Sequence, residues 1–407
     1  MSKRKILVVY GTRPEAIKMA PVVAALHRSP HVRPVVAVTG QHRAMLDQVN
    51  ELFGIVPTHD LDIIAIRQTL EGITVKALTG VSAVIAAEQP DAVLVQGDTT
   101  TCFAAALAAF YQQVPVVHLE AGLRTHQRYN PFPEEGNRLL TTQLASLHLA
   151  PTQTSYDNLL RSGVQPADVV ITGNTVIDAL LEVVSRQIGI DDAAAQRTLD
   201  TIGTRPLLLV TSHRRESWGE PMRHTALAIA QLAGRFPELV ILLPAHLNPV
   251  VREVLLPPLE GLDNVVITDP LSYSDFSQVL NRSTVVLTDS GGVQEEAPSL
   301  GKPVLVTRET TERPEAVVAG TVRLVGTDTD KIVHAVSELL TDEVAYERMA
   351  HAVNPYGDGK AAGRSVAAIE HFFGLRDRPD GFRPAPTLVS PDPAGIEDDL
   401  PLEQIAG

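Results

Sequence analysis

The chain has 407 residues and only one cysteine, Cys102. A single thiol cannot form a disulfide within the chain, and it cannot build a zinc site from cysteines. Cys102 stands in the apolar segment TTTCFAAALAAF, which predicts a helix and favours a buried structural thiol over a nucleophile. A cytoplasmic location is the default expectation for such a sequence.

Basic residues are also scarce: Lys and Arg number 34 against 48 Asp and Glu, which gives a formal net charge of −14. Nucleic acid is therefore not an expected partner, because phosphate backbones need a basic surface. An anionic small molecule would have to be bound by local groups acting against the field of the whole chain. We find no apolar run long enough to span a bilayer and expect no membrane segment. The basic N-terminus precedes a short apolar run, but GTRPE follows where a cleavage site should lie, so a first strand is predicted there.

Several motifs are missing. The sequence has neither Gly-x-Gly-x-x-Gly nor GxxxxGK[ST], which argues against nicotinamide binding and P-loop chemistry. The acidic triplet DLD at 60–62 is a weak metal signal and favours a solvated loop. His27 and His31 are four residues apart, but Pro30 interrupts the helix that would align them. We expect no metal and no cofactor.

Short β-branched runs alternate with Ala- and Leu-rich amphipathic stretches along most of the chain. Runs such as KILVVYG, DAVLVQGD, PLLLVTSH and TVVLTDSGG are continuously apolar, as parallel strands covered on both faces are. Repeated βα units predict an α/β protein, and the length favours two domains. We place the first domain at 1–172 and the second at 173–359. The segment 376–407 is rich in Pro, Gly and acidic residues and is predicted to be a disordered tail.

Unusual polar residues follow the predicted strands in both halves. Because ligands of open parallel sheets bind beyond the carboxyl ends of the strands, these residues are candidates for a site. Each also has a structural interpretation: Asp98 before three threonines can cap a helix, and paired glutamates can complement a helix dipole. The strand-end segments are GTRPEAIK, TGQHR, QGDTTT, HLEAGLRT, TSHRRES, PAHLNP and TDSGGVQEE, with PFPEEGNR soon after the fourth.

The turn Ser290-Gly291-Gly292 lies between a predicted strand and a predicted helix. Glycines let a ligand approach the backbone, and N–H groups at a helix start point towards a phosphate. Such uncharged donors work even in an acidic protein. With Glu295 or Glu296 one turn later as an acceptor for ribose hydroxyls, the segment predicts a nucleotide diphosphate site, although a structural Gly-rich turn remains an alternative.

The motifs GTRPEAIKMAP, GDTTT, EAGLRT, PEEGNR, HRRES, HLNP, DSGGVQEEAPSLGKPVL, TTERPEAV and NPYGDGKA together resemble the non-hydrolysing UDP-N-acetylglucosamine 2-epimerases, from about residue 5 to about residue 373. The resemblance implies a GT-B-like fold, with two Rossmann-like doubly wound parallel-sheet domains facing a central cleft. A helix at about 360–374 is expected to pack back on the first domain. The family interconverts UDP-GlcNAc and UDP-ManNAc through elimination of UDP, and its members are typically homodimers.

The family's site residues match positions of this chain. Resemblance implies that the residues that handle protons are Asp98, Glu120, Glu134 and His213. It implies substrate or UDP contacts for Arg13, Lys18, Arg138, Phe276, Ser290, Gly291, Gly292, Glu296 and Arg313, with Phe276 packed on the uracil and Glu296 on the ribose. The resemblance does not say which group is base and which is acid.

Some members bind a second UDP-GlcNAc as an activator. The matching residues are Gln41, Arg67, Arg214 and His246. Ala44 stands where a polar residue is often found and Gln96 stands where many members have His, so the activator behaviour is in question.

Three alternatives stay open. A hydrolysing 2-epimerase would release ManNAc and UDP, but such enzymes usually carry a kinase domain for which this chain has no room. A GT-B glycosyltransferase would not require carboxylates with the epimerase spacing. A sugar-nucleotide sensor would not require Asp98, Glu120, Glu134 and His213 together.

Overall fold

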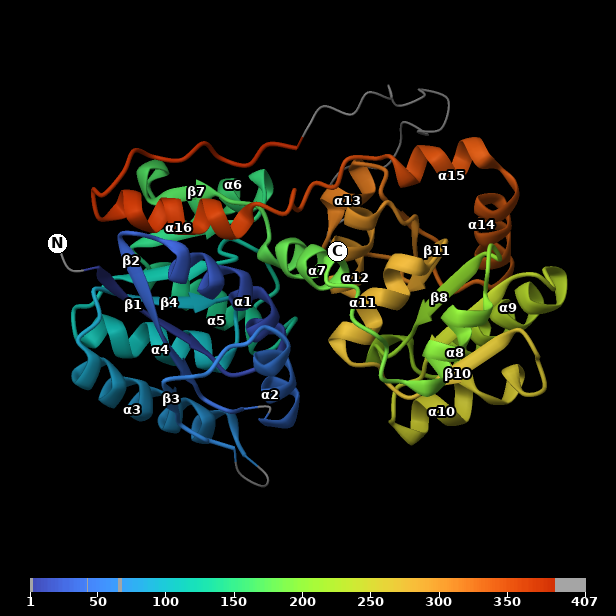
Figure 1. Ribbon diagram of the computed structural model, residues 1–407, viewed down its shortest axis with the longest axis horizontal. Helices are drawn as coiled ribbons and strands as arrows, with labels where there is room; N and C mark the ends of the chain where they lie inside the picture. The colour runs from blue at the N-terminus through green and yellow to red at the C-terminus, as the bar shows by residue number, and fades with distance from the viewer. Residues whose placement is uncertain (1–2, 42, 65–67, 385–407) are drawn as a thin grey trace. The chain divides into compact units, whose positions relative to one another are not determined.

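The computed structural model describes residues 3–41, 43–64 and 68–384, except for the side chain of Arg215. The chain divides into two compact units (Figure 1). The first unit consists of Met1–Ala179 and Tyr356–Arg383, and the second contains Leu180–Pro355. The division therefore lies within a helix, at Ala179, and not at residue 172 where the sequence restarts a βα pattern.

The first unit contains a seven-stranded sheet in the order β3-β2-β1-β4-β5-β6-β7, and all its described strand pairs are parallel. Its strands are β1 (Arg4–Tyr10), β2 (Val32–Val38), β3 (His59–Asp60), β4 (Ala92–Gln96), β5 (Val116–Leu119), β6 (Leu147–Ala150) and β7 (Val169–Ile171). The sequence did not predict β3, because two residues carry no apolar run. All five residues of β4 are buried, as expected for a strand covered on both faces.

Helices accompany the first sheet. They are α1 (Arg13–Arg28), α2 (Arg43–Leu52), α3 (Leu70–Glu88), α4 (Thr100–Tyr111), α5 (Glu134–Leu144), α6 (Gln153–Arg161) and α16 (Ala361–Phe372). The division between the units runs through the next helix, α7 (Thr175–Ser185). α3 and α4 share a buried cluster with β1, β2 and β4 that includes Val81, Ala105, Leu7, Val35 and Val93. α1 contacts α16, the helix that the chain adds to this unit after passing through the second one (Figure 1).

The second unit contains a six-stranded parallel sheet in the order β10-β9-β8-β11-β12-β13. Its strands are β8 (Leu207–Thr211), β9 (Val240–Pro244), β10 (Val265–Thr268), β11 (Val285–Thr288), β12 (Val304–Val306) and β13 (Val322–Leu324). Its helices are α8 (Ala193–Thr201), α9 (Glu220–Arg235), α10 (Pro249–Leu255), α11 (Tyr273–Arg282), α12 (Gly291–Glu296), α13 (Pro314–Val318), α14 (Thr329–Thr341) and α15 (Glu343–Ala350). The prediction of two parallel-sheet α/β domains is confirmed.

Helix α3 corrects the expectation that no apolar run could span a bilayer. It has 19 residues and a mean hydropathy of 1.4, so by length and composition alone it could cross a membrane. In the structure, however, one side of α3 contributes Ile73, Ala77, Val81 and Ile85 to buried clusters. Its apolar character is partly explained by this packing. Val75, on another side of the helix, is 59% exposed.

The segment after α16 docks on the first unit, so the prediction of a disordered tail is wrong for residues 376–383. Arg378 donates hydrogen bonds to the carbonyl oxygens of Pro166, Ala167 and Val169. The backbone N–H of Phe382 donates to Ile171 O at 2.7 Å, and the Phe382 side chain is buried. The segment therefore covers β7, the edge strand of the first sheet. Residues 385–407 lie outside the described residues.

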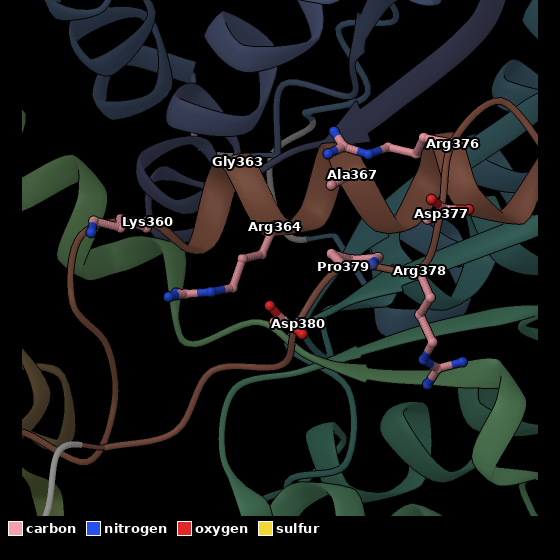
Figure 2. A pocket seen from close by; sticks show the side chains of 9 residues that line it. All are labelled: Lys360, Gly363, Arg364, Ala367, Arg376, Asp377, Arg378, Pro379 and Asp380. Carbon is pink, nitrogen blue, oxygen red and sulfur yellow. The ribbon is translucent and has the colours of Figure 1, made fainter.

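A pocket of about 690 Å³ lies between α16 and this segment (Figure 2). Its lining includes Arg364 and Arg376, whose charges are already partnered within the first unit. Arg364 binds both carboxylate oxygens of Asp358 at 2.7 Å, and Arg376 lies 3.1 Å from Glu370. The pocket therefore belongs to the attachment of the C-terminal segment.

Candidate functional site

The strand order of each sheet reverses at one point, and the candidate residues gather there. In the first sheet the reversal lies between β1 and β4, which pair directly. In the second it lies between β8 and β11. Ligands of open α/β sheets bind beyond the carboxyl ends of strands at this position. The loops that follow β4, β8 and β11 carry Asp98, His213 and the Ser290 turn, and Arg13 begins the helix after β1.

In the first unit a buried glutamate, Glu15, links the loops after β1 and β4. Its carboxylate accepts hydrogen bonds from the backbone N–H groups of residues 11 and 12, at 3.0 and 2.8 Å, and from Thr99 Oγ1 at 2.6 Å. Burial raises the pKa of the Glu15 carboxyl, while these hydrogen bonds act in the opposite direction. The link fixes the positions from which Arg13 and Asp98 project.

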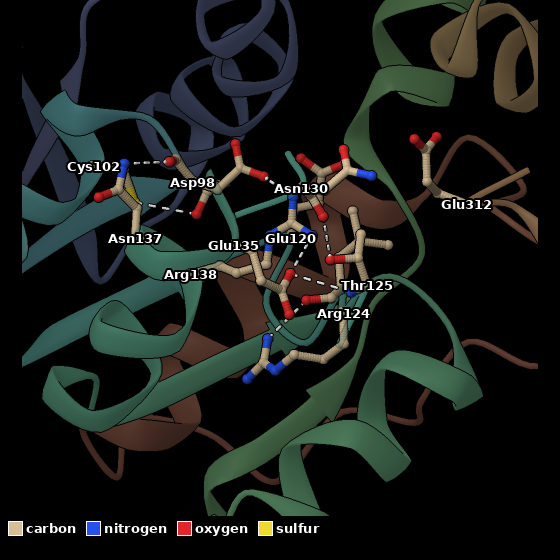
Figure 3. Close-up of polar contacts among 12 residues, drawn as sticks. Asp98, Cys102, Glu120, Arg124, Thr125, Asn130, Glu135, Asn137, Arg138 and Glu312 are labelled. Carbon is tan, nitrogen blue, oxygen red and sulfur yellow. Dashed lines mark hydrogen bonds and ion pairs between the residues drawn. The ribbon is translucent and has the colours of Figure 1, made fainter. Parts of the chain in front are cut away.

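The side chain of Asp98 is not a helix cap. Thr99 is the N-cap of α4 and accepts the hydrogen bond from Cys102 N at 3.0 Å. Asp98 instead lies 2.7 Å from Arg138 Nη2, and Arg138 Nη1 lies 2.9 Å from Glu135 (Figure 3). Arg138 and Glu135 are buried, whereas the Asp98 side chain is 28% exposed. The partly exposed carboxylate of Asp98 is thus held by the buried Arg138–Glu135 ion pair.

Two further side chains, those of Asn137 and His118, hold the backbone around Asp98. Asn137 donates to Asp98 O at 2.9 Å. The His118 ring lies beneath this loop, with its Nε2 2.7 Å from Gly97 O. Burial lowers the pKa of His118 to about 4, so the ring is neutral near neutral pH and its Nε2–H can donate to that carbonyl. Gly97 adopts φ 68°, which suits glycine.

Glu120 follows β5 in the left-handed region, with φ 59°. Its carboxylate accepts hydrogen bonds from Lys18 Nζ at 2.6 Å, from Gln96 Nε2 and from Asn174 Nδ2 at 3.0 Å. A side chain at Gly97 would lie 3.7 Å from Glu120 Oε2, so this carboxylate adjoins the loop that carries Asp98. The structure therefore brings Lys18, Glu120, Asp98 and Arg138 together at the carboxyl ends of the strands of the first sheet.

Arg13 and Glu134 differ from these residues. Arg13 begins α1 and Glu134 begins α5, and both side chains are half-buried. Neither has a hydrogen-bond or ion-pair partner among the residues that the structure describes. Each side chain therefore remains available to a ligand.

In the second unit a buried aspartate, Asp289, links the loops after β8 and β11. Its Oδ2 accepts hydrogen bonds from the backbone N–H groups of His213 and Arg214, at 2.8 and 2.9 Å. Its Oδ1 lies 3.1 Å from His213 Nδ1. Each reversal point thus has one buried carboxylate that links its two loops, through the Thr99 hydroxyl in the first unit and through the backbone N–H groups of His213 and Arg214 in the second.

The Ser290-Gly291-Gly292 turn lies beside two guanidinium groups. A side chain placed at Gly291 would lie 3.3 Å from Arg214 Nη2 and 3.9 Å from Arg313 Nη2. Ser290 is the N-cap residue of α12, yet its hydroxyl makes no capping hydrogen bond. Bare backbone, a hydroxyl and two guanidinium groups form a suitable site for an anion.

The other UDP candidates lie on the helices near this turn. Glu296 is at the end of α12, 8% exposed, and its Oε1 accepts a hydrogen bond from Tyr273 Oη at 3.2 Å. Phe276 lies on α11, one turn after Tyr273, and is half-buried. Arg313 Nε donates to Glu295.

The residues matched to an activator are divided between the units. Gln41 Oε1 accepts a hydrogen bond from Thr101 Oγ1 at 3.3 Å in the first unit. The His246 ring stacks on that of His213 in the second, with centroids 6.4 Å apart. Arg214 Nη2 adjoins Gly291, also in the second unit. Arg67 lies outside the described residues.

Two remaining predictions concern the thiol and metals. Cys102 is buried and burial raises the pKa of its thiol well above the ordinary value, so the interpretation as a structural cysteine is confirmed. Among residues 3–41, 43–64 and 68–384, no group of three or more His, Cys, Asp or Glu side chains is arranged to hold a metal ion.

Three residues that support the site were not singled out from the sequence: Glu15, Asn174 and Asp289. Glu15 stands inside the motif GTRPEAIK, and its place in that motif was the only sequence signal for it. Asn174 bonds Glu120 across 54 positions of sequence, which no local pattern could indicate.

Comparison with known proteins agrees with this geometry. A family model described as UDP-N-acetylglucosamine 2-epimerase matches residues 24–370. The UDP-N-acetylglucosamine 2-epimerase of Escherichia coli K12 is 52% identical over 370 residues, which cover 90% of this chain and 98% of that protein. The crystal structure of UDP-GlcNAc 2-epimerase from Neisseria meningitidis bound to UDP-GlcNAc has a TM-score of 0.81 at 45% identity, covering 90% of this chain and 100% of that one.

A more distant structural neighbour concerns the fold alone. The glycotransferase of kitacinnamycin has a TM-score of 0.60 at 13% identity and covers 92% of this chain and 100% of its own. Two parallel-sheet α/β units and this neighbour indicate the GT-B glycosyltransferase-like fold. The family match and the 52% identity over nine-tenths of the chain identify the family as well as the fold. This chain belongs to the UDP-N-acetylglucosamine 2-epimerase family.

Proposed function

We propose that the protein is a non-hydrolysing epimerase that interconverts UDP-GlcNAc and UDP-ManNAc. One observation supports this most directly. The carboxyl ends of the first sheet's strands carry side chains that can handle protons, Asp98 and Glu120 among them, and the reversal point of the second sheet carries a turn at Gly291 suited to an anion. Epimerisation of a nucleotide sugar needs both groups that handle protons and a site that binds the diphosphate.

The chemistry explains why several proton-handling groups are required. The C2 proton of a pyranoside is not next to a carbonyl, so direct removal and return of that proton is not feasible near neutral pH. Expulsion of UDP from C1 with loss of the C2 proton gives a 2-acetamidoglucal, and UDP then adds back as a proton arrives on the other face. The reaction needs a base, an acid and a site that retains UDP.

The first unit supplies the candidates for proton transfer. Lys18 offsets the charge of Glu120, and Arg138 does the same for Asp98. Both carboxylates are thereby held in fixed orientations, as general acid–base catalysis requires. We assign Asp98, Glu120 and Glu134 of the first unit, together with His213 of the second, to proton handling, and leave open which is base and which is acid. Arg13 is assigned to substrate binding.

The second unit supplies the groups that hold the leaving diphosphate. We assign the pyrophosphate to Ser290, Gly291 and Gly292, with Arg313 beside them. Negative charge develops on the diphosphate as the C1–O bond breaks, and fixed donors stabilise it without reorganising. Glu296 is assigned to the ribose and Phe276 to the uracil.

The protein is expected to produce UDP-ManNAc that carries deuterium at C2 when it is incubated with UDP-GlcNAc in D2O and followed by proton NMR. Solvent deuterium enters because the C2 proton is lost to a protein group and replaced. Free ManNAc with UDP would identify the hydrolysing reaction instead. An unchanged spectrum would contradict both and favour a transferase without its acceptor or a sensor.

The same assay tests whether a second UDP-GlcNAc acts as an activator. Activation would make the initial rate depend sigmoidally on UDP-GlcNAc concentration, whereas a hyperbolic dependence would mean that Gln41, Arg214 and His246 hold no activator.

We also propose a homodimer that uses the outer face of α3 and the end of α4. Large apolar side chains are exposed there: Val75 by 59%, Phe110 by 54% and Tyr111 by 66%. Val75→Glu and Tyr111→Asp are expected to reduce the mass measured by light scattering from two chains to one. Val318→Glu, at another exposed site in the second unit, should leave the mass unchanged. A wild-type mass of one chain would contradict the proposal. The cytoplasmic location stays a prediction.

A further inference from the structure

Asp289 holds His213 at two places. One carboxylate oxygen accepts hydrogen bonds from the backbone N–H groups of His213 and Arg214, at 2.8 and 2.9 Å. The other lies 3.1 Å from Nδ1 of the His213 ring. The Asp289 side chain is 0% exposed, so water cannot replace either contact.

The carboxylate of Asp289 is ionised near neutral pH. Burial alone would raise its pKa, but the His213 ring and the two backbone N–H groups lower the pKa below its ordinary value. An anion that faces a ring nitrogen favours a proton on that nitrogen. In neutral His213 the proton therefore belongs on Nδ1, and Nε2 has a free lone pair.

The neighbouring His246 ring has the opposite arrangement. Its Nδ1 accepts a hydrogen bond from Asn248 N at 3.2 Å, which places the proton of neutral His246 on Nε2. The two rings stack with centroids 6.4 Å apart. The side chain of His213 is 43% exposed, so its free edge can reach a ligand or solvent.

We propose that Asp289 is a positioning residue that fixes the tautomer of His213, so that Nε2 is the nitrogen that takes up or releases a proton. The part of this inference that concerns turnover rests on the proposed function. When Nε2 accepts a proton, the ring becomes a cation, and the charge of Asp289 stabilises it while Nδ1 keeps its own proton.

The variant Asp289→Asn separates the two contacts of the carboxylate. The single oxygen of asparagine is held in place of Oδ2 by two backbone N–H donors, so the NH2 group must face Nδ1. Two donors cannot face one another, and His213 should change to the tautomer with its proton on Nε2. We expect the epimerisation rate to fall about tenfold to a hundredfold, with water at the exposed ring edge limiting the loss.

The tautomer can be read directly in the substrate-free protein. We would label histidine with ¹⁵N, assign the His213 signals by their loss in His213→Gln, and record long-range ¹H–¹⁵N correlations near pH 8. Asp269→Asn is a matched control, because Asp269 also follows a strand of the same sheet but is exposed and pairs with Arg252.

The expected result is a proton on Nδ1 in the wild type and in Asp269→Asn, and on Nε2 in Asp289→Asn. A wild-type proton on Nε2 would overturn the proposal, even if Asp289→Asn failed to fold. So would a folded Asp289→Asn that keeps the wild-type tautomer or the wild-type rate. Because the tautomer is measured without substrate, failure of the proposed function would appear in the deuterium experiment and not in this one.

Discussion

The Asp98→Asn variant is expected to lose about a thousandfold in kcat while it binds UDP as the wild type does. Asparagine has the same shape and can still accept a hydrogen bond from Arg138 Nη2, which lies 2.7 Å from Asp98 Oδ2. It cannot exchange a proton near neutral pH. The residues that we assign to UDP belong to the second unit, whereas Asp98 belongs to the first.

Three measurements test this expectation. The rate and the incorporation of deuterium at C2 should fall together, and UDP should raise the melting temperature of the variant as it does that of the wild type. Asp168→Asn, which removes an exposed carboxylate from the same unit, should change neither. Wild-type turnover in Asp98→Asn would remove Asp98 from the mechanism.

The Gly292→Val variant is expected to bind UDP about a hundredfold more weakly or worse, without loss of stability. Gly292 is exposed, and a Cβ atom there would meet only Glu296 Oε2, at 3.8 Å. We therefore expect the fold to tolerate the substitution. A diphosphate that approaches the backbone would not, because the isopropyl group occupies its place, and a hydrogen bond to a charged group contributes about 1.5 to 3 kcal/mol.

Isothermal titration with UDP would measure the loss of affinity. The control is Gly234→Val, since Gly234 is also an exposed glycine of the second unit and a side chain there would meet nothing within 4 Å. Unchanged affinity in Gly292→Val would mean that the Ser-Gly-Gly turn is structural only, and the pyrophosphate would have to be sought elsewhere.

The strands could be predicted well from the sequence because a parallel sheet covered on both faces requires continuous apolar runs. The run VVLT of β11, for example, is buried at all four positions. The exceptions were elements whose cause is not local. The two residues of β3 are a strand only because β2 lies beside them. Phe382 stands in a segment with the composition of a disordered tail, but it is buried against the first unit.

The candidate residues at the strand ends could be predicted from the sequence. The buried residues that hold them in place could not. Asp289 is the first residue of the motif DSGGVQEEAPSLGKPVL, and its contact with His213 spans 76 positions of sequence. Local patterns do not encode such pairs, because only the strand order places β8 next to β11. The structural interpretation of Asp98 as a helix cap is wrong, because Thr99 is the N-cap of α4.

The late addition of α16 and residues 376–383 to the first unit has a consequence for biosynthesis. The second unit is continuous in sequence from Leu180 to Pro355, so all its residues have been translated before those of α16. The first unit cannot cover its edge strand β7 until Arg378 and Phe382 have left the ribosome. Nascent domains usually mature in the order in which they are translated. Here the domain that is begun first is finished last, and its open edge is exposed to the chaperones of the nascent chain for the whole interval.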